Sequence, residues 1–190
     1  MYIVIDCETT GLPKNWNAPV SDTDNWPRVI QIAWSRFDKD LRNTESFAFL
    51  IQPEGFTIPP EAQRIHHIST ERAEREGKPL QAALLEFTHA VKNSDVIVAH
   101  NLRFDESVIS AEYVRLNVIP PFGNKKRICT MRATTNLCRI PGAYGYKWPS
   151  LSELHRELFH AEFEEAHDAG ADVSACANCF IELKRRGLLV

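Results

Sequence analysis

Two acidic residues close the first apolar run of the chain. Tyr2 to Ile5 is rich in β-forming side chains, which predicts a strand buried on both faces, and Asp6 and Glu8 end it. Side chains two residues apart on a strand point to the same side, about 6.6 Å apart along the chain. Carboxylates placed in this way repel unless a cation neutralises them, and hard divalent ions such as Mg²⁺ take oxygen ligands. The alternative is a solvated strand end at which both side chains face water.

Two later segments carry residues of the same chemistry. A second apolar run, Val96 to Val98, leads to a segment that ends in Asp105, and the last helical segment opens with His167 and Asp172. Together with the first pair they form three ordered motifs: Asp-x-Glu-Thr-x-Gly, His-Asn-x-x-Phe-Asp and His-x-x-x-x-Asp.

With these motifs the chain resembles the DEDDh branch of the proofreading-type (DnaQ-like) 3′→5′ exonucleases, and it is similar to the proofreading epsilon subunit of DNA polymerase III. The resemblance runs from Tyr2 to the C-terminus. It implies a ribonuclease H-like fold and metal-dependent release of 5′-mononucleotides from the 3′ end of single-stranded nucleic acid, with DNA favoured. An RNA-directed exoribonuclease of the same fold, or a noncatalytic nucleic-acid-binding module, is the alternative.

The resemblance also implies roles for the acidic residues. Asp6 would bridge two Mg²⁺ ions, for which Mn²⁺ is a usual substitute, Glu8 and Asp172 would complete the site of the attacking water, and Asp105 would bind directly or through water. Two such ions can activate water, neutralise the phosphoryl oxygens and stabilise the leaving 3′-oxygen. His167 is the general-base candidate, because imidazole titrates close to neutral pH.

The resemblance also implies how the 3′ end of the substrate is held. Backbone groups near Thr9 and Gly11 would contact the terminal nucleotide, and Leu12 would lie as a wedge between the last two bases. His66, Asn101 and Phe104 are expected near the substrate. His66 could instead be a loop histidine, and Phe104 could be ordinary core. A polymerase or repair protein is the partner that this resemblance suggests.

Helix geometry constrains the third motif. Residues five apart on a helix diverge by roughly 140°, since each residue turns about 100°. His167 and Asp172 therefore cannot share a helical face, and we expect His167 just before the helix, on a segment able to move, with Asp172 in its early turns. Asp168 is then expected as the N-cap residue rather than as a metal ligand.

The pattern of the remaining chain predicts the elements that position these residues. An α/β fold is expected, with a mixed five-stranded sheet flanked by helices in one domain over residues 1–190. Strands are predicted over residues 2–5, 29–37, 45–51, 96–99 and 128–130. Helices are predicted over 80–92, from about 104 to 116, up to about 139, over 151–159 after a Ser150 cap, and over 169–186, with a loop at 141–149.

Composition narrows the class of protein. The net charge of −3 argues against a generic nucleic-acid coat, but it is compatible with a metal site that meets one phosphodiester at a time. No apolar run approaches the roughly 20 residues that cross a bilayer, so we expect no membrane association and a cytoplasmic location. Cys176 and Cys179 form a Cys-x-x-Cys inside a helical pattern without a second pair, which favours buried, reduced thiols over zinc.

Two further features have alternative interpretations. The segment from Leu12 to Pro27 reads as a long loop in which Trp16 or Trp26 could stack on a base or, as we favour, cover the edge of the core. Four basic residues could contact phosphates of the incoming strand or could simply be solvated; they are Lys125, Lys126, Arg127 and Lys147.

Overall fold

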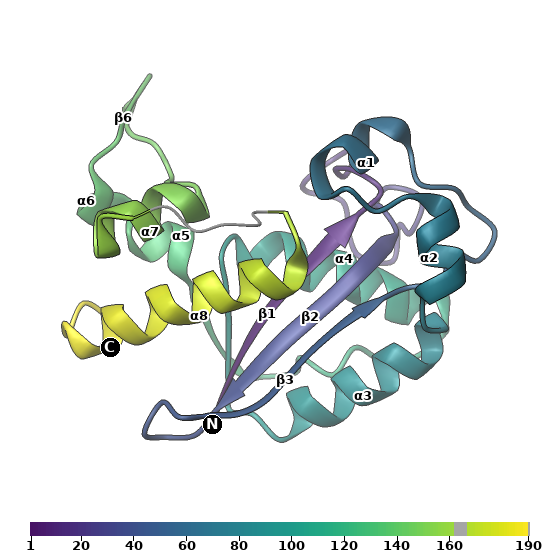
Figure 1. Ribbon diagram of the computed structural model, residues 1–190, viewed down its shortest axis with the longest axis horizontal. Helices are drawn as coiled ribbons and strands as arrows, with labels where there is room; N and C mark the ends of the chain where they lie inside the picture. Colours follow the sequence, from purple (N-terminus) through teal and green to yellow (C-terminus); the bar gives the residue numbers. More distant parts are fainter. Residues whose placement is uncertain (162–166, 190) are drawn as a thin grey trace.

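The computed structural model describes residues 1–161 and 167–189 and has a mixed sheet of five strands at its centre (Figure 1). The spatial order of the strands is β3-β2-β1-β4-β5. β2 runs antiparallel to both β1 and β3, whereas β1, β4 and β5 are parallel. The strands are β1 (Tyr2–Thr9), β2 (Val29–Phe37), β3 (Asn43–Leu50), β4 (Val96–Ala99) and β5 (Lys126–Cys129). The predicted fold class is thereby confirmed.

Alternation along β1 places its side chains in two apolar clusters, one on each face of the sheet. Ile3 and Ile5 belong to one apolar cluster with α3 (Leu80–Lys92) and α4 (Leu102–Arg115), whereas Val4 belongs to another with α8 (Ala169–Arg185). Figure 1 shows α8 crossing one face of the sheet and α4 lying behind the other. Because successive side chains on a strand point to opposite faces, each residue of β1 is assigned to one of these two sides.

Smaller elements surround this core. They are α1 (Pro60–His66), α2 (Thr70–Glu76), α5 (Thr130–Ala133), α6 (Thr135–Cys138), β6 (Pro141–Gly142), β7 (Gly145–Tyr146) and α7 (Leu151–Phe159). Ser150 begins α7 with a capping box, as predicted, in which its hydroxyl accepts from the Glu153 backbone. None of the described helices is long and apolar enough to span a bilayer.

Two predicted elements were wrong. The single helix up to residue 139 is divided between α5 and α6 at Thr134, whose hydroxyl donates to the carbonyl of Thr130 one turn back. Such a side-chain bond competes with helical backbone bonding. The expected loop at 141–149 contains the β6–β7 hairpin, which projects from the body (Figure 1), and Gly145 supplies a φ of 117° at its turn.

The boundaries of other elements differ from the prediction by a few residues. α4 begins at Leu102 rather than near Phe104, β3 spans Asn43–Leu50, and β5 spans Lys126–Cys129. Ile51, expected to end the third strand, pairs instead with Lys78 in an isolated bridge.

The segment between β1 and β2 is held by buried charge. Glu112 of α4 is fully buried, accepts hydrogen bonds from Arg28 Nε and the Val29 backbone (both 2.9 Å), and forms an ion pair with Arg115 Nη1 at 3.1 Å. Arg115 also donates to the carbonyl of Trp26 at 2.7 Å. A single carboxylate on α4 therefore organises two arginines that fix the end of this segment.

The two tryptophans of this segment differ in environment. Trp26 is buried and its Nε1 donates to the Pro19 carbonyl at 3.1 Å, which confirms the core-covering interpretation for this residue. Trp16 is 40% exposed.

The Cys-x-x-Cys pair is structural. Cys176 and Cys179 are free and buried on the inner side of α8. Burial raises the pKa of Cys179 to about 12 and that of Cys176 well above its ordinary value. Thiols that stay protonated are poor ligands and poor nucleophiles, in agreement with the sequence interpretation.

Candidate active site

Asp6 and Glu8 lie on the α8 side of the sheet. They occupy alternate positions of β1 in step with Val4, whose side chain packs in the α8 cluster. Both remain paired with β2, opposite Ala33 and Gln31 respectively. The strand therefore presents two carboxylates toward the N-terminal end of α8, as the spacing predicted.

Asp105 reaches the same strand from the opposite layer. The last parallel pair between β1 and β4 is Val4 with Val98, so the edge of β1 is open beyond it. Asp105, in the first turn of α4 and 2% exposed, fills this gap. Its Oδ1 accepts from the Cys7 backbone at 3.2 Å and from Cys7 Sγ at 3.3 Å. Because the pairing of β4 with β1 stops at Val98, the carboxylate of Asp105 on α4 can contact the backbone of β1.

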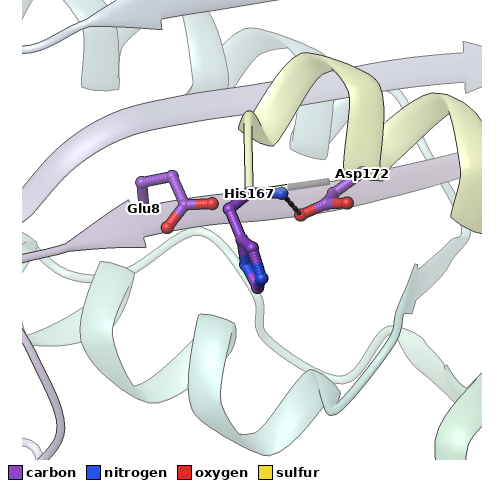
Figure 2. A group of neighbouring side chains, drawn as sticks. All are labelled: Glu8, His167 and Asp172. Atoms are coloured by element: carbon purple, nitrogen blue, oxygen red, sulfur yellow. Dashed lines mark hydrogen bonds between the residues drawn. The ribbon is translucent and has the colours of Figure 1, made fainter. Parts of the chain in front are cut away.

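His167 and Asp172 meet Glu8 where α8 begins. His167 precedes the helix with a φ of 72°, and its backbone N–H donates to Asp172 Oδ2 at 3.1 Å. One possible ligand atom from each of Glu8, His167 and Asp172 lies within 4.8 Å of the others. Figure 2 shows the histidine between the two carboxylates. The predicted placement of His167 before the helix and Asp172 in its first turn is confirmed.

Asp168 caps this helix, and a glutamine fixes the cap to the sheet. Asp168 Oδ1 accepts from the backbones of Gly170 (3.0 Å) and Ala171 (3.1 Å), as its N-cap prediction requires. Gln31 Nε2 donates to Asp168 Oδ2 at 2.8 Å, and Gln31 Oε1 accepts from the Ala169 backbone at 2.9 Å. The sequence analysis missed Gln31. Its only sequence signal is a polar side chain within the otherwise apolar start of β2.

Burial and mutual repulsion keep these carboxyl groups protonated more readily than usual. Burial is the largest cause at each position, and neighbouring carboxylates add to it. The pKa of Glu8 rises to about 8, that of Asp105 to about 7 and that of Asp172 to about 6. The pKa of Asp6 also rises well above its ordinary range, while hydrogen bonds from Cys7 partly offset the rise at Asp105.

The donor set fits a divalent cation. Asp6, Glu8, Asp105 and Asp172 offer oxygen atoms, which hard cations prefer, and their shared charge is unfavourable without a positive counterpart. A bound ion would reverse the sign of the local field and favour the ionised carboxylates. Repulsion within the set is therefore a physical reason why these residues are suited to hold a cation.

The turn after β1 presents an exposed apolar side chain. Thr9 is buried and its Oγ1 donates to the Gly11 carbonyl at 2.7 Å, while Gly11 has a φ of 145°, which favours glycine. Leu12 follows and is 72% exposed. These positions suit contact with a terminal nucleotide, which stays a prediction.

His66 is the last residue of α1, so its interpretation as a loop histidine was wrong. It is buried, and its Nδ1 accepts from the Ile68 backbone at 3.0 Å. Its Nε2 has no hydrogen-bond partner among the described residues. Burial is the main cause that lowers the pKa of His66, and His167 is close enough to contribute. A buried nitrogen without a partner, near His167, remains a candidate substrate contact.

Asn101 and Phe104 belong to the second motif. Asn101 precedes α4 with a φ of 71° and makes no side-chain cap bond. Phe104 is partly buried against the main core and also contacts the Trp16 ring, with centroids 5.8 Å apart. Phe104 therefore combines a core contact with a position at the surface.

His100, for which the sequence analysis gave no role, links two later segments. One ring nitrogen lies 3.0 Å from Thr130 Oγ1, and Nε2 donates to the Pro149 carbonyl at 3.0 Å. Its position at the start of the second motif was the available signal.

All four basic residues considered for phosphate contact have partners within the chain. Lys125 donates to the Ser94 carbonyl, Arg127 pairs with Glu106, and Lys147 pairs with Glu153. Lys126 also has an interaction partner.

Solved structures with the same fold are nucleases. Escherichia coli exonuclease I in complex with a dT13 oligonucleotide matches with a TM-score of 0.77 and 21% identity, over 97% of this chain and 41% of that one. The zinc-bound form of its complex with single-stranded DNA matches with a TM-score of 0.73 and 24% identity, over 97% and 40%. The fold is therefore the ribonuclease H-like fold of such enzymes, as the sequence resemblance implied.

The sequence comparisons give the family. The RNase_T profile, described as exonuclease, matches residues 3–180. PolC-type DNA polymerase III of Streptococcus agalactiae is 33% identical over 184 residues, which are 96% of this chain and 11% of that protein. The Streptococcus pneumoniae protein is 30% identical over 174 residues, or 92% and 10%. The chain spans about a tenth of the length of these relatives. It belongs to the RNase_T exonuclease family.

Proposed function

We propose that this chain hydrolyses the terminal phosphodiester bond at the 3′ end of single-stranded nucleic acid, with DNA favoured, and releases 5′-mononucleotides with the help of two Mg²⁺ ions or Mn²⁺ in their place. The observation that carries this proposal is a cluster of four carboxyl groups with raised pKa values, two of which, Glu8 and Asp172, lie beside the exposed His167. A single domain over residues 1–190 is part of the same proposal.

The residues divide the chemistry between them. Asp6, Glu8, Asp105 and Asp172 would hold the ions, which when bound supply charge neutralisation at the phosphoryl oxygens and acidify water. His167 accepts a proton from the attacking water, because its side chain is exposed beside Glu8 and Asp172. The hydrogen bond from its backbone to Asp172 holds the turn from which this imidazole projects.

The 3′-terminal nucleotide is held next to these groups. Backbone at Thr9 and Gly11 faces the nucleotide, Leu12 separates its base from the preceding one, and the unpartnered nitrogen of His66 supplies a polar contact. The remaining contacts come from Asn101 and Phe104 at the start of α4.

Two features bear on substrate and partner. The acidic residues meet only phosphate and water, which DNA and RNA share, so an RNA-directed exoribonuclease is the second candidate. The PolC-type relatives are polymerases, and E. coli exonuclease I was solved with single-stranded DNA. These names support a DNA substrate and a polymerase or repair partner.

Matched oligonucleotides of DNA and RNA, labelled at either end, test the reaction with Mg²⁺. We expect the 5′-labelled strand to give a ladder that shortens from the 3′ end, and the 3′-labelled strand to release a labelled mononucleotide at once. EDTA and Asp6→Asn should abolish cleavage. His167→Ala should lower kcat roughly 10²–10⁴-fold, the usual contribution of a general base.

His89→Ala is the matched control, since His89 is exposed on α3 in the opposite layer and should retain full activity. Absence of cleavage on every substrate by the folded, Mg²⁺-supplied protein would favour the noncatalytic module instead. Cleavage of RNA alone would establish the exoribonuclease.

A further inference from the structure

A groove of about 900 Å³ lies along the outer side of α4, apart from the acidic cluster. The start of α4 forms one wall, and the segment from β5 into α5 forms another. Two tryptophans and three arginines line it, namely Trp16, Trp148, Arg103, Arg127 and Arg132. Neither the acidic motifs nor the proposed contacts at the 3′ end include these side chains.

The two tryptophans are exposed but fixed in place. Trp16 and Trp148 are 40% and 60% exposed. The Trp16 ring contacts Phe104, and Arg103 donates to the Trp16 carbonyl. Exposed aromatic rings on a held backbone lose little conformational freedom when a flat ligand stacks on them.

Trp148 is held from both of its chain neighbours. Lys147 pairs with Glu153 at 2.7 Å, and the Pro149 carbonyl accepts from His100 at 3.0 Å. Because His100 is the first residue of the second motif, it ties this tryptophan to the same motif that carries Asp105.

The arginines of the groove differ in whether another side chain pairs with their guanidinium group. Arg127 pairs with Glu106 at 2.6 Å, and Arg103 donates to Asn17 Oδ1 at 2.9 Å. The Arg132 side chain is exposed and makes no hydrogen bond or ion pair within residues 1–161 and 167–189, although the backbone carbonyl of this residue accepts from Thr135. An unneutralised guanidinium beside two exposed indole rings, on a chain of net charge −3, favours a ligand that is both flat and anionic.

α4 carries residues of both the groove and the acidic cluster. Arg103, Glu106 and Ser107 are spaced i, i+3 and i+4, so they share the helix face that lines the groove. Asp105 lies roughly opposite this face and contacts β1. Asn101 and Leu102, where α4 begins, also line the groove, so a strand whose end is held at the acidic cluster would reach the groove by passing the start of α4.

We propose that this groove binds the single strand on the 5′ side of the bond to be cleaved, with bases stacked on Trp16 and Trp148 and a phosphate paired with Arg132. Stacking on aromatic side chains tolerates any base, and a phosphate is common to both sugars, so the groove accepts DNA and RNA alike. This inference rests on the proposed function, because it extends the path of the same substrate.

Binding can be measured without cleavage in an Asp6→Asn background, by fluorescence anisotropy of labelled ten-nucleotide oligo-dT and oligo-U. Trp148→Ala and Trp16→Ala should each raise Kd about 5- to 100-fold, since stacking contributes roughly that much per base. Arg132→Ala should reduce the slope of log Kd against log salt by about 0.7, the value for one phosphate contact on a single strand.

Matched controls lie outside the groove. Tyr144→Ala removes a fully exposed aromatic ring between β6 and β7, and Arg185→Ala removes an exposed guanidinium near the C-terminal end of α8. Both should leave Kd and the salt slope as in the parent. Trp148→Phe should recover most of the binding that Trp148→Ala loses, which separates stacking from misfolding.

A second substrate separates this proposal from the proposed function. The nitrophenyl ester of thymidine 5′-monophosphate carries one nucleotide, so it does not extend into the groove. In the catalytically intact protein, Trp148→Ala should lower kcat/KM on the ten-nucleotide strand at least tenfold more than on the ester. If the parent cleaves neither substrate, the proposed function fails while the anisotropy still tests the groove. If Trp148→Ala and Trp16→Ala bind both oligonucleotides like the parent, the groove proposal is wrong.

Discussion

Asp105 illustrates the conflict between function and stability at a single residue. Its carboxyl group is almost fully buried, and the pKa is raised to about 7, chiefly by burial. At pH 8 in the absence of metal, the folded chain must therefore keep the ionised carboxylate of Asp105 in a buried environment, which lowers the free energy of unfolding. The backbone and thiol of Cys7 offset only part of this, because the other carboxylates lie nearby.

Asp105→Asn should therefore stabilise the metal-free protein and inactivate the enzyme. An amide oxygen can still accept from the Cys7 backbone, but it brings no charge to the cluster. We expect a gain on the order of 1–3 kcal/mol in the free energy of unfolding at pH 8 in EDTA, and loss of exonuclease activity with Mg²⁺. Thermal or urea unfolding measures the first effect, and digestion of a labelled strand measures the second.

Asp40→Asn is the control for this prediction. Asp40 is exposed on the β2–β3 connection and pairs with the exposed Arg42, so its change should stay within about 0.5 kcal/mol. A metal-free Asp105→Asn protein that is less stable than the parent at pH 8 would show that the hydrogen bonds of this carboxylate outweigh its repulsion.

At the scale of elements, the position of α8 depends on β2. Gln31 binds both the Asp168 side chain and the Ala169 backbone, so the first turn of α8 is fastened opposite Glu8. Asp172 lies one turn into that helix. Gln31 on β2 thereby fixes the position of Asp172 on α8 relative to Glu8 on β1.

Gln31→Leu should weaken metal binding although it removes no ligand. The substitution keeps a similar volume, but it breaks both hydrogen bonds to the start of α8. We expect the Mg²⁺ concentration for half-maximal activity to rise roughly 10-fold or more, as is usual when groups that orient metal ligands are lost. Activity measured across a Mg²⁺ titration, together with the unfolding midpoint, distinguishes a positioning effect from a general loss of stability.

Gln81→Leu provides the comparison, because Gln81 is exposed on α3 in the opposite layer. A Gln31→Leu protein with a lower unfolding midpoint and an unchanged Mg²⁺ requirement would mean that Gln31 only stabilises the fold.

At the scale of the whole molecule, the acidic cluster sets how stability depends on pH. Raised pKa values mean that the folded chain binds protons more tightly than the unfolded chain between about pH 4 and pH 8. Stability contributed by these groups is therefore lost as the pH rises through that interval. Mg²⁺ competes with the same protons, so its stabilising effect should grow with pH.

The expected result is an unfolding temperature, in EDTA, that is higher at pH 6 than at pH 8.5. Saturating Mg²⁺ should raise it more at pH 8.5 than at pH 6. Differential scanning calorimetry in four buffers gives the answer. An unfolding temperature in EDTA that rises between pH 6 and pH 8.5 would contradict the cluster as the main source of the pH dependence.

Most of the sheet could be predicted from the sequence for reasons that are local, whereas the roles of the five site residues came from the family resemblance and stay predictions. Apolar runs and partial alternation identified the strands, and the placement of Asp6 and Glu8 on one side followed from the geometry of one strand. The position of His167 outside α8 followed from the helical turn alone. Each of these inferences needs only neighbours in the chain.

The parts that sequence reasoning missed depend on contacts between distant segments. Gln31 has its role because α8, more than 130 residues later, begins beside it. His100 likewise acts on Pro149, and Thr134 interrupts a helix through a side-chain bond that competes with the backbone. The hydrophobic periodicity of a sequence does not indicate which distant residues form such contacts. The roles at the substrate's 3′ end and the single domain over 1–190 stay predictions.

The buried carboxylate of Glu112 has a consequence for how such a domain can diverge. It fastens the segment that carries Leu12 and Trp16, about two turns of α4 beyond Asp105. Substitutions around Glu112 would alter the affinity for the nucleic-acid strand, while the residues that cleave the phosphodiester bond stay unchanged. The affinity for the substrate strand and the rate of bond cleavage can therefore change independently during evolution. Substrate preference can change while every catalytic residue is retained.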